Sequence, residues 1–263
     1  IVNPQQDDRY REYVDLMLAR TNRRGITPDA ARTIVRSNTT VIGAIAVERG
    51  DADAMLCGLD GRFLCHLQYV EMIVGRAPGV HELSGLSMLI NQEGVWFMTD
   101  TYISENPAAE EIAEMTILAA AEIARFGVEP RAALLSASDF GSRNDPSALK
   151  MRRAAELLFR DAPHLQVDGE MHGDTALSEI IRARVMPDSR LKGQANLLVF
   201  PNLDAANITL NVVKQMTSAL HLGPILIGTA KPVHVLTPSV TSRGVYNMSA
   251  IAATGSMVEH HTA

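Results

Sequence analysis

Short and almost entirely apolar segments alternate along this chain with longer amphipathic segments, and this alternation restricts the fold more than any other feature. The predicted strands cover residues 53–58, 96–100, 132–136, 166–168, 195–200, 225–227 and 233–235. The predicted helices cover residues 9–23, 27–36, 64–74, 106–126, 146–160, 176–184 and 205–220. Strands without a polar face must be covered on both sides, as in parallel sheets. The sequence therefore predicts an α/β fold with mostly parallel sheets.

Helix ends are marked by residues with known capping preferences. Thr27 followed by Pro28 predicts a helix start, because a threonine hydroxyl accepts from the first free N–H groups and proline suits the first helical turn. Asn106 is likewise predicted to cap the helix that follows it, and Gly127 to end that helix. These signals place the strand–helix junctions, where α/β proteins keep their binding loops.

Composition excludes several classes of function. The 24 basic and 30 acidic residues give a net charge of −6, so the chain has no bulk attraction for nucleic acid. No apolar run approaches the roughly 18–20 residues that span a membrane. Cys57 and Cys65 are too few for a disulfide framework and indicate reduced thiols. We therefore expect a cytoplasmic protein without nucleic-acid or membrane partners.

Three loops that follow predicted strands carry polar side chains, and ligands of α/β proteins bind beyond the carboxyl ends of strands. The first loop contains Ser136, Ser138, Gly141 and Ser142. Hydroxyl and backbone N–H donors of this kind bind phosphate or carbonyl oxygens. An ordinary strand-to-helix turn with a serine cap is the alternative interpretation.

The second loop contains amide and carboxylate side chains after the predicted strand 195–200. Asn202 and Asp204 either contact a ligand or cap the next helix, whereas Asn207 lies further inside that helix and is less easily explained by capping.

The third loop and the N-terminal region supply hydroxyl and guanidinium groups, which bind phosphate-bearing molecules. These candidates are Thr237, Ser239, Thr241, Arg243, Arg23, Arg24 and Arg36. The alternatives are a serine- and threonine-rich connector for the loop and a solvated surface for the three N-terminal arginines.

Acidic and histidine side chains alternate over residues 168–174. In a strand, Asp168, Glu170, His172 and Asp174 would share one face and resemble a set of metal ligands. Two glycines interrupt such a strand, so a turn without a metal is the preferred interpretation. The sequence has no glycine-rich dinucleotide loop, P-loop, nucleophile elbow or zinc-ligand spacing.

Taken together, five segments resemble the phosphate acetyltransferase family. They are residues 106–114, 135–142, 167–170, 200–208 and 223–228, in collinear order over almost the whole chain. Residues 36–43, 61–67 and 237–248 are similar instead to the C-terminal phosphotransacetylase-like domain of bacterial NADP-dependent malic enzymes. The resemblance also favours a structural role for residues 168–174, because the family is not known for a metal there.

The C-terminal segment departs from active family members at the positions that carry their chemistry. Active members have a Ser-Arg pair and, six residues after the arginine, an aspartate thought to deprotonate coenzyme A. By resemblance, these positions hold Thr237, Pro238 and Gly244 in this chain. Proline and glycine supply neither a cation nor a proton acceptor, and Arg243 cannot replace the base. The resemblance therefore implies a domain without catalytic residues of its own.

The resemblance implies a two-lobed phosphotransacetylase-like fold with a cleft between the lobes. One lobe comprises residues 1–79 and 229–263, and the other comprises residues 80–228. We expect the first lobe to be incomplete at its N-terminus, because the chain begins with Ile1 rather than methionine, in a segment (Ile1–Pro4) that resembles the end of a strand.

In the hybrid enzymes this domain is taken to be regulatory, with acetyl-CoA as an inhibitory effector and with dimer contacts that contribute to a larger assembly. The resemblance thus implies an oligomerising domain that binds acetyl-CoA or a related coenzyme A compound and has no cofactor of its own. NADP and a divalent metal are expected in the malic domain, which would convert malate to pyruvate. An active phosphate acetyltransferase and a purely structural dimerisation module are the two alternatives.

Overall fold

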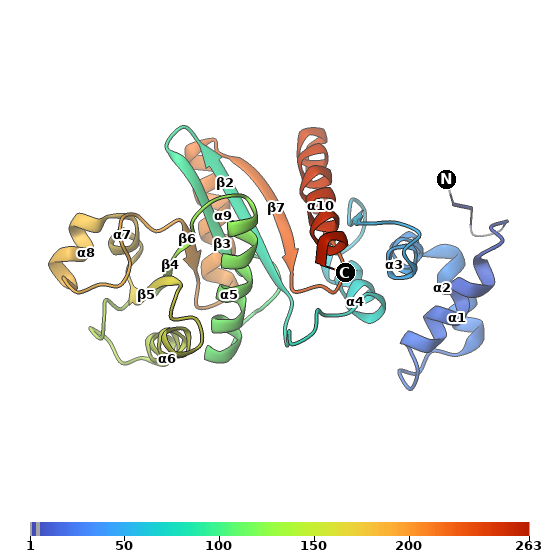
Figure 1. The fold of residues 1–263 in the computed structure, drawn as a ribbon, viewed down its shortest axis with the longest axis horizontal. Coiled ribbons are helices and arrows are strands. Elements are labelled where there is room, and N and C mark those ends of the chain that lie inside the picture. Colours follow the sequence, from blue (N-terminus) through green and yellow to red (C-terminus); the bar gives the residue numbers. More distant parts are fainter. Residues whose placement is uncertain (1, 4–5, 263) are drawn as a thin grey trace. The chain divides into compact units, whose positions relative to one another are not determined.

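The computed structural model describes residues 2–3 and 6–262, with side chains up to residue 255. The chain divides into two compact units, one made of residues 1–79 and 229–263 and the other of residues 80–228 (Figure 1). Within the described residues, no helix combines the length and the apolar character needed to cross a membrane. Cys57 and Cys65 are free thiols.

The first unit consists mainly of helices around a small parallel sheet. Its helices are α1 (Tyr10–Arg20), α2 (Pro28–Ser37), α3 (Thr39–Arg49), α4 (Phe63–Ile73) and α10 (Ser242–Thr262). Strand β1 (Met55–Cys57) pairs in parallel with β8 (Val233–Val235). The carboxyl ends of these two strands, and the loops that follow them, therefore lie together.

Local side-chain chemistry sets the helix boundaries of this unit. Thr27 Oγ1 accepts from the N–H of Ala30, and Pro28 is the first residue of α2, as predicted. Asn38 ends α2, and its side chain accepts from the N–H of Val41 to begin α3. One residue, Asn38, thus separates two helices, of which the sequence predicts only the first.

A six-stranded sheet with strand order β5-β4-β6-β3-β2-β7 forms the centre of the second unit. The strands are β2 (Ser84–Asn91), β3 (Gly94–Thr99), β4 (Arg131–Leu135), β5 (Gln166–Met171), β6 (Leu197–Val199) and β7 (Leu220–Ile227). Strands β5, β4, β6 and β3 are parallel to one another, whereas β2 is antiparallel to β3 and to β7. The predicted α/β fold with mostly parallel pairing is confirmed.

Helices cover both faces of this sheet, as its apolar strands require (Figure 1). On one face lie α5 (Ala109–Arg125) and α6 (Pro146–Asp161), and Phe97 of β3 stacks on Phe126 with ring centroids 6.2 Å apart. The next residue, Met98, belongs to a core cluster on the opposite face with Ala206 and Leu210. That face is covered by α7 (Gly173–Leu177) and α9 (Leu203–Thr217), and the short helix α8 (Glu179–Val185) follows α7.

Other parts of the fold also differ from the predictions. Strand β2 lies in residues 84–91, where no element is predicted, and α10 begins inside the segment 236–244 that is predicted as a loop. The predicted helix 176–184 is two helices separated at Ser178, whose hydroxyl accepts from the N–H of Ile181. In the predicted strand end at Ile1–Pro4, Ile1 and Pro4 lie outside the described residues.

The predicted cap of α5 is wrong. Helix α5 begins after Ala108, whose N–H donates to Glu111 Oε2 at 2.6 Å. Asn106 instead accepts a hydrogen bond from Lys150 Nζ. The amide side chain therefore links two elements of the fold and does not satisfy the N-terminus of its own helix.

Candidate functional site

The carboxyl ends of β3, β4, β5 and β6 meet at one edge of the six-stranded sheet, because these strands are parallel. Backbone bonds from Phe200 to Thr99 O (3.0 Å) and from Leu203 to Glu105 O (3.1 Å) join the loops after β3 and β6. The predicted site residues that follow β4 and β6 are Ser136, Ser138, Gly141, Ser142, Asn202, Asp204 and Asn207. This edge is the candidate site of the second unit.

Glu170, at the end of β5, organises the loop after β4. Its carboxylate, only 1% exposed, accepts from Ser138 Oγ (2.8 Å), from the Gly141 N–H (2.9 Å) and from Arg152 (2.9 and 3.2 Å). Burial acts to raise the pKa of Glu170, but these donors outweigh burial and lower it. The loop is thus closed around an internal carboxylate, and two donors predicted to face a ligand are directed at Glu170.

The other hydroxyls of this loop are also bonded within it. Ser136 Oγ accepts from the N–H of Ser138 (3.1 Å), and Ser142 Oγ accepts from the N–H of Asp139 (2.9 Å). The cap of α6 is Asp145, whose carboxylate accepts from a first-turn N–H at 3.1 Å, so the alternative prediction of a serine cap is wrong. The serines therefore stabilise the loop conformation, and the carboxylate of Asp145 caps α6.

The loop after β6 holds α9 in place. Asn202 Oδ1 accepts from the N–H of Ala205 (2.9 Å) and caps α9, which confirms the simpler interpretation of this residue. Asp204 is exposed in the first turn, where the helix dipole stabilises a carboxylate. Asn207 Nδ2 donates to Thr101 O (3.0 Å) and so ties α9 to the loop after β3.

Sequence reasoning misses two charged residues at this edge. Lys150 Nζ, on α6, donates to Asn106 Oδ1 and to Pro201 O, both at 2.7 Å, and burial lowers the pKa of this lysine. Asp100 accepts from the N–H groups of Gly85 and of residues 102–104, and burial raises the pKa of Asp100 in spite of these bonds. The position of Asp100 at the carboxyl end of a predicted strand is a usable signal, whereas only tertiary structure brings Lys150 to two loops.

The four alternating side chains of residues 168–174 do not converge. Asp168 Oδ2 accepts from Ser189 Oγ (2.7 Å), whereas His172 Nδ1 lies 2.9 Å from Asp139 Oδ2. In the described part of the chain, no group of three or more His, Cys, Asp or Glu side chains is placed to hold a metal ion. The turn predicted for this segment is wrong over its first half, because β5 continues to Met171.

Gly169 allows β5 to continue. Its φ of 144° lies in a region that side chains disfavour, and a Cβ there would lie 2.8 Å from Leu134 O in the neighbouring strand. The register of β5 against β4 shifts just beyond this point. A glycine that reads as a strand break in the sequence is therefore a bulge within a strand.

In the first unit, the loops after β1 and β8 lie side by side. The N–H of Leu236 donates to Cys57 O at 2.7 Å. Gly58 has a φ of 94°, and a Cβ there would overlap the Leu236 carbonyl. Glycine at this position is what permits the two loops to approach so closely.

The loop after β8 contains the remaining hydroxyl candidates. Thr237 Oγ1 and Ser239 Oγ are 3.0 Å apart, and Thr241 Oγ1 accepts from the N–H of Gly244 (3.1 Å) in the first turn of α10. Arg243 is exposed in that same turn. The hydroxyls of Thr237 and Ser239 therefore lie together, whereas Thr241 caps α10.

Gly244, at the position where the family resemblance places the base, is packed against Val240. A Cβ at Gly244 would lie 2.6 Å from Val240 Cγ2, closer than real Cβ contacts. Valine is stiff about its χ1 bond, so any side chain at residue 244 requires this loop to move. The packing thus fits a glycine and not an aspartate.

The three N-terminal arginines do not form one group. Arg23 and Arg24 are exposed in the turn before α2, whereas Arg36 lies in its last turn and stacks on Tyr10, with Cζ 4.8 Å from the ring centroid. A helix of this length rises roughly 15 Å. Arg36 therefore cannot share one phosphate with Arg23 or Arg24.

Comparison with known proteins adds a family to this geometry. A family model described as phosphate acetyl/butaryl transferase matches residues 1–253. The chain is 63% identical over 252 residues to an NAD-dependent malic enzyme of Rhizobium meliloti, covering 96% of this chain and 33% of that protein. It is 49% identical over 253 residues to an NADP-dependent malic enzyme of Escherichia coli, with the same coverage of 96% and 33%.

Solved structures show the same fold. A phosphotransacetylase from Streptococcus pyogenes superposes with a TM-score of 0.89 at 28% identity, covering 97% of this chain and 77% of that one. The chain spans about a third of the length of the malic enzymes that it matches (33%).

Proposed function

Since the chain belongs to the phosphate acetyl/butaryl transferase family, we propose that it is the regulatory, oligomerising domain of a malic enzyme and that it binds acetyl-CoA or a related coenzyme A compound. In this proposal, malate is decarboxylated elsewhere in the enzyme, with NADP and a divalent metal. The similar malic enzymes are named for NAD in one case and for NADP in the other.

The packing of Gly244 against Val240 is the observation that carries the proposal. Together with Thr237 and Pro238, it leaves the family's reaction without its arginine and its base and without space for a base at residue 244. A fold that keeps its shape and lacks its proton acceptor is suited to binding a ligand without converting it. This favours an effector domain over an active phosphate acetyltransferase.

Groups that suit an anionic effector lie at the carboxyl ends of strands in each unit. In the first unit, the hydroxyls of Thr237 and Ser239 lie together, and the exposed Arg243 follows them in the chain. In the second, Lys150 is held by two neutral oxygens and keeps a third N–H donor for a ligand. Effector binding would regulate the enzyme to the extent that it favours one of two states of the whole assembly.

We expect this chain to bind acetyl-CoA saturably in calorimetric titration. We also expect it to form no acetyl-CoA when it is supplied with acetyl phosphate and coenzyme A. Arg243→Ala should weaken binding about tenfold, because a charge-assisted hydrogen bond is lost. Arg184→Ala, an exposed arginine on α8, is the control and should bind as the parent does. Turnover would support the active enzyme instead, and no binding would support the structural module.

Helix α9 offers a surface for oligomerisation. Ile208, Val212 and Met216 are spaced four residues apart on one side of the helix and are 60%, 48% and 79% exposed. A two-fold interface uses the same patch on both copies, so one apolar stripe suffices to form a dimer. We propose that this stripe is the dimer contact.

Val212→Glu should convert the dimer to a monomer at micromolar concentration, because a two-fold axis brings two like charges into an apolar contact. Light scattering after size exclusion measures the mass directly. Lys214→Glu, on the same helix but on a face away from the stripe, should remain dimeric. A dimer that survives Val212→Glu would place the contact on another surface.

A further inference from the structure

A cavity of about 280 Å³ lies in the second unit between the sheet and α9. Trp96, Leu198 and Phe200 contribute apolar walls from the sheet side. The volume is just below the roughly 300–1,000 Å³ typical of small-molecule sites. The cavity therefore suits a compact ligand with an apolar body.

Helix α9 lines this cavity with residues next to its core face and not with its exposed stripe. Ala206 and Leu210 are fully buried and anchor the helix to the sheet. Thr209, Val213 and Thr217, again four residues apart, line the cavity. Small β-branched side chains at these positions leave the space that larger residues would fill.

The charge at the cavity decides which ligand it suits. Among the described residues that line the cavity, Glu93, in the turn between β2 and β3, is the charged one, and none is a lysine or arginine. A carboxylate and the face of a tryptophan ring both attract a cation. Glu93 would repel a ligand with a carboxylate or phosphate.

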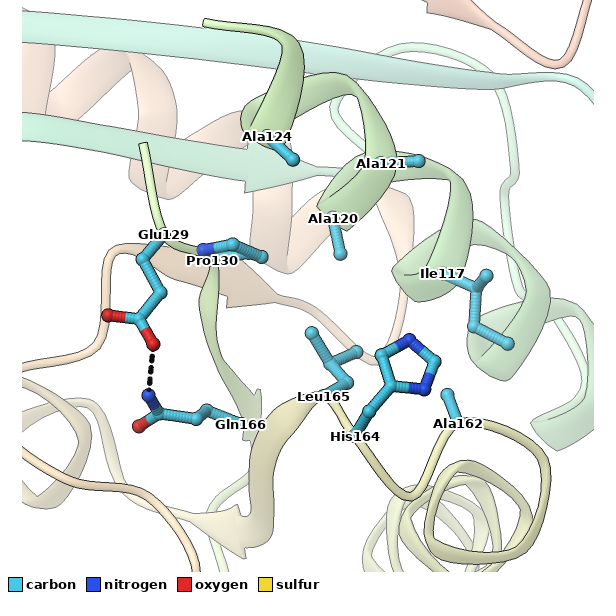
Figure 2. Close-up of a pocket in the computed structure, with 10 residues that line it drawn as sticks. All are labelled: Ile117, Ala120, Ala121, Ala124, Glu129, Pro130, Ala162, His164, Leu165 and Gln166. Carbon is cyan, nitrogen blue, oxygen red and sulfur yellow. Dashed lines mark hydrogen bonds between the residues drawn. The ribbon is translucent and has the colours of Figure 1, made fainter. Parts of the chain in front are cut away.

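A second pocket in the same unit shows the contrast. It measures about 350 Å³ and lies between α5 and the start of β5, with alanines on one wall (Figure 2). Its carboxylate, Glu129, accepts from Gln166 Nε2 at 2.6 Å, so that charge already has a partner within the wall. This pocket offers no comparable recognition of a cation and serves as a reference site.

We propose that the cavity beneath α9 binds a small apolar molecule that carries a protonated amine, such as an arylalkylamine, with the apolar body between Trp96 and Val213 and the ammonium group toward Glu93. This site is separate from the proposed acetyl-CoA function and does not depend on it.

The experiment uses Trp96, the single tryptophan of the chain, as a fluorescent reporter inside the site. The probes are 2-phenylethylamine, 2-phenylethanol and phenylacetate, which share an apolar body and differ in charge. We expect a saturable change of tryptophan emission with the amine, binding about fivefold weaker with the alcohol, and no saturation with the acid.

Two kinds of variant test the geometry. Val213→Phe fills the cavity and should abolish the response to every probe, and Thr209→Phe, one turn earlier, is a second filler in case the first fails to fold. Glu93→Gln should remove the preference for the amine while the alcohol still binds. Ala121→Leu, which fills the reference pocket, should leave all responses unchanged.

Circular dichroism confirms that each variant is folded before titration. The proposal is overturned if the amine gives no saturable change, if a folded filler variant responds as the parent does, or if phenylacetate binds as tightly as the amine.

Discussion

Arg152→Met is expected to lower the melting temperature by about 10 °C at neutral pH, because it leaves the carboxylate of Glu170 buried without its cation. Arg152 contacts both carboxylate oxygens and also donates to Arg143 O (3.0 Å) in the loop after β4. Its removal therefore releases the same loop that carries Ser138 and Gly141. Arg153→Met, the exposed neighbour, should change the melting temperature by no more than about 2 °C.

The pH dependence of this variant has a definite sign. In the parent, the pKa of Glu170 is lowered, so the pair stabilises the fold above the unfolded carboxyl pKa of about 4.3 and loses this effect as the pH falls through the lowered value. In Arg152→Met, burial is no longer opposed by the guanidinium, and we expect the pKa of Glu170 to rise above the unfolded value. Protonation of Glu170 as the pH falls toward this raised pKa should then restore stability and narrow the stability gap to the parent.

A double variant separates the charge from the packing. Arg152→Met with Glu170→Gln removes the unpaired carboxylate and should be more stable at neutral pH than Arg152→Met alone. The parent, Arg152→Met, Glu170→Gln and the double variant form a double-mutant cycle. Their thermal unfolding is measured from neutral to acidic pH. A gap that stays constant with pH, or a double variant no more stable than the single one, would contradict an ionic role for Glu170.

The elements that the sequence predicts correctly are those whose signals are local. Thr27 and Pro28, which are adjacent in the chain, define the start of α2. The threonine side chain accepts a hydrogen bond from the first turn, and the proline ring favours the helical backbone conformation. The strands β4, β6 and β8 are buried, and their apolar composition is a local signal that predicts this burial.

The elements that the sequence misses depend on distant partners. β2 contains Gly85 and two serines, and its strand conformation is fixed by antiparallel neighbours on both sides. The first turns of α10 contain Gly244 and hydroxyl residues with weak helix propensity, yet Met248 and Ile251 are buried and hold the helix against the first unit. Tertiary packing overrides local preference at both places.

The candidate site shows the same limit. Position after a strand is a local signal, and it correctly brings the predicted loops to one edge of the sheet. What those side chains contact is not local: Ser138 bonds to Glu170, 32 residues away in sequence, and Lys150 reaches Pro201, 51 residues away. Spacing therefore identifies the loops but not the partners within them.

Arg182→Met should destabilise the second unit by about 3–5 kcal/mol, because Arg182 is a charged side chain that is buried and bonded to neutral carbonyls. The residue is 1% exposed, and its guanidinium donates to Thr175 O (3.1 Å), Leu191 O (3.2 Å) and the carbonyls of Ala176 and Gly193. Burial lowers the pKa of Arg182.

These bonds explain why an arginine is retained at a buried position. Two of the carbonyls belong to α7, which is too short to satisfy its own C-terminal groups, and two belong to the loop before β6. Methionine has a similar length but no donor, so Thr175 O, Leu191 O and Gly193 O lose this partner, whereas Ala176 O keeps its bond from the N–H of Ala195 (3.1 Å). Arg182→Lys keeps the charge with fewer donors and should lose about half as much stability. Urea unfolding measures the difference, with Arg184→Met as the exposed control on the same helix. If Arg182→Met and Arg184→Met unfold at the same urea concentration, the guanidinium does not hold α7 and α8 to the sheet.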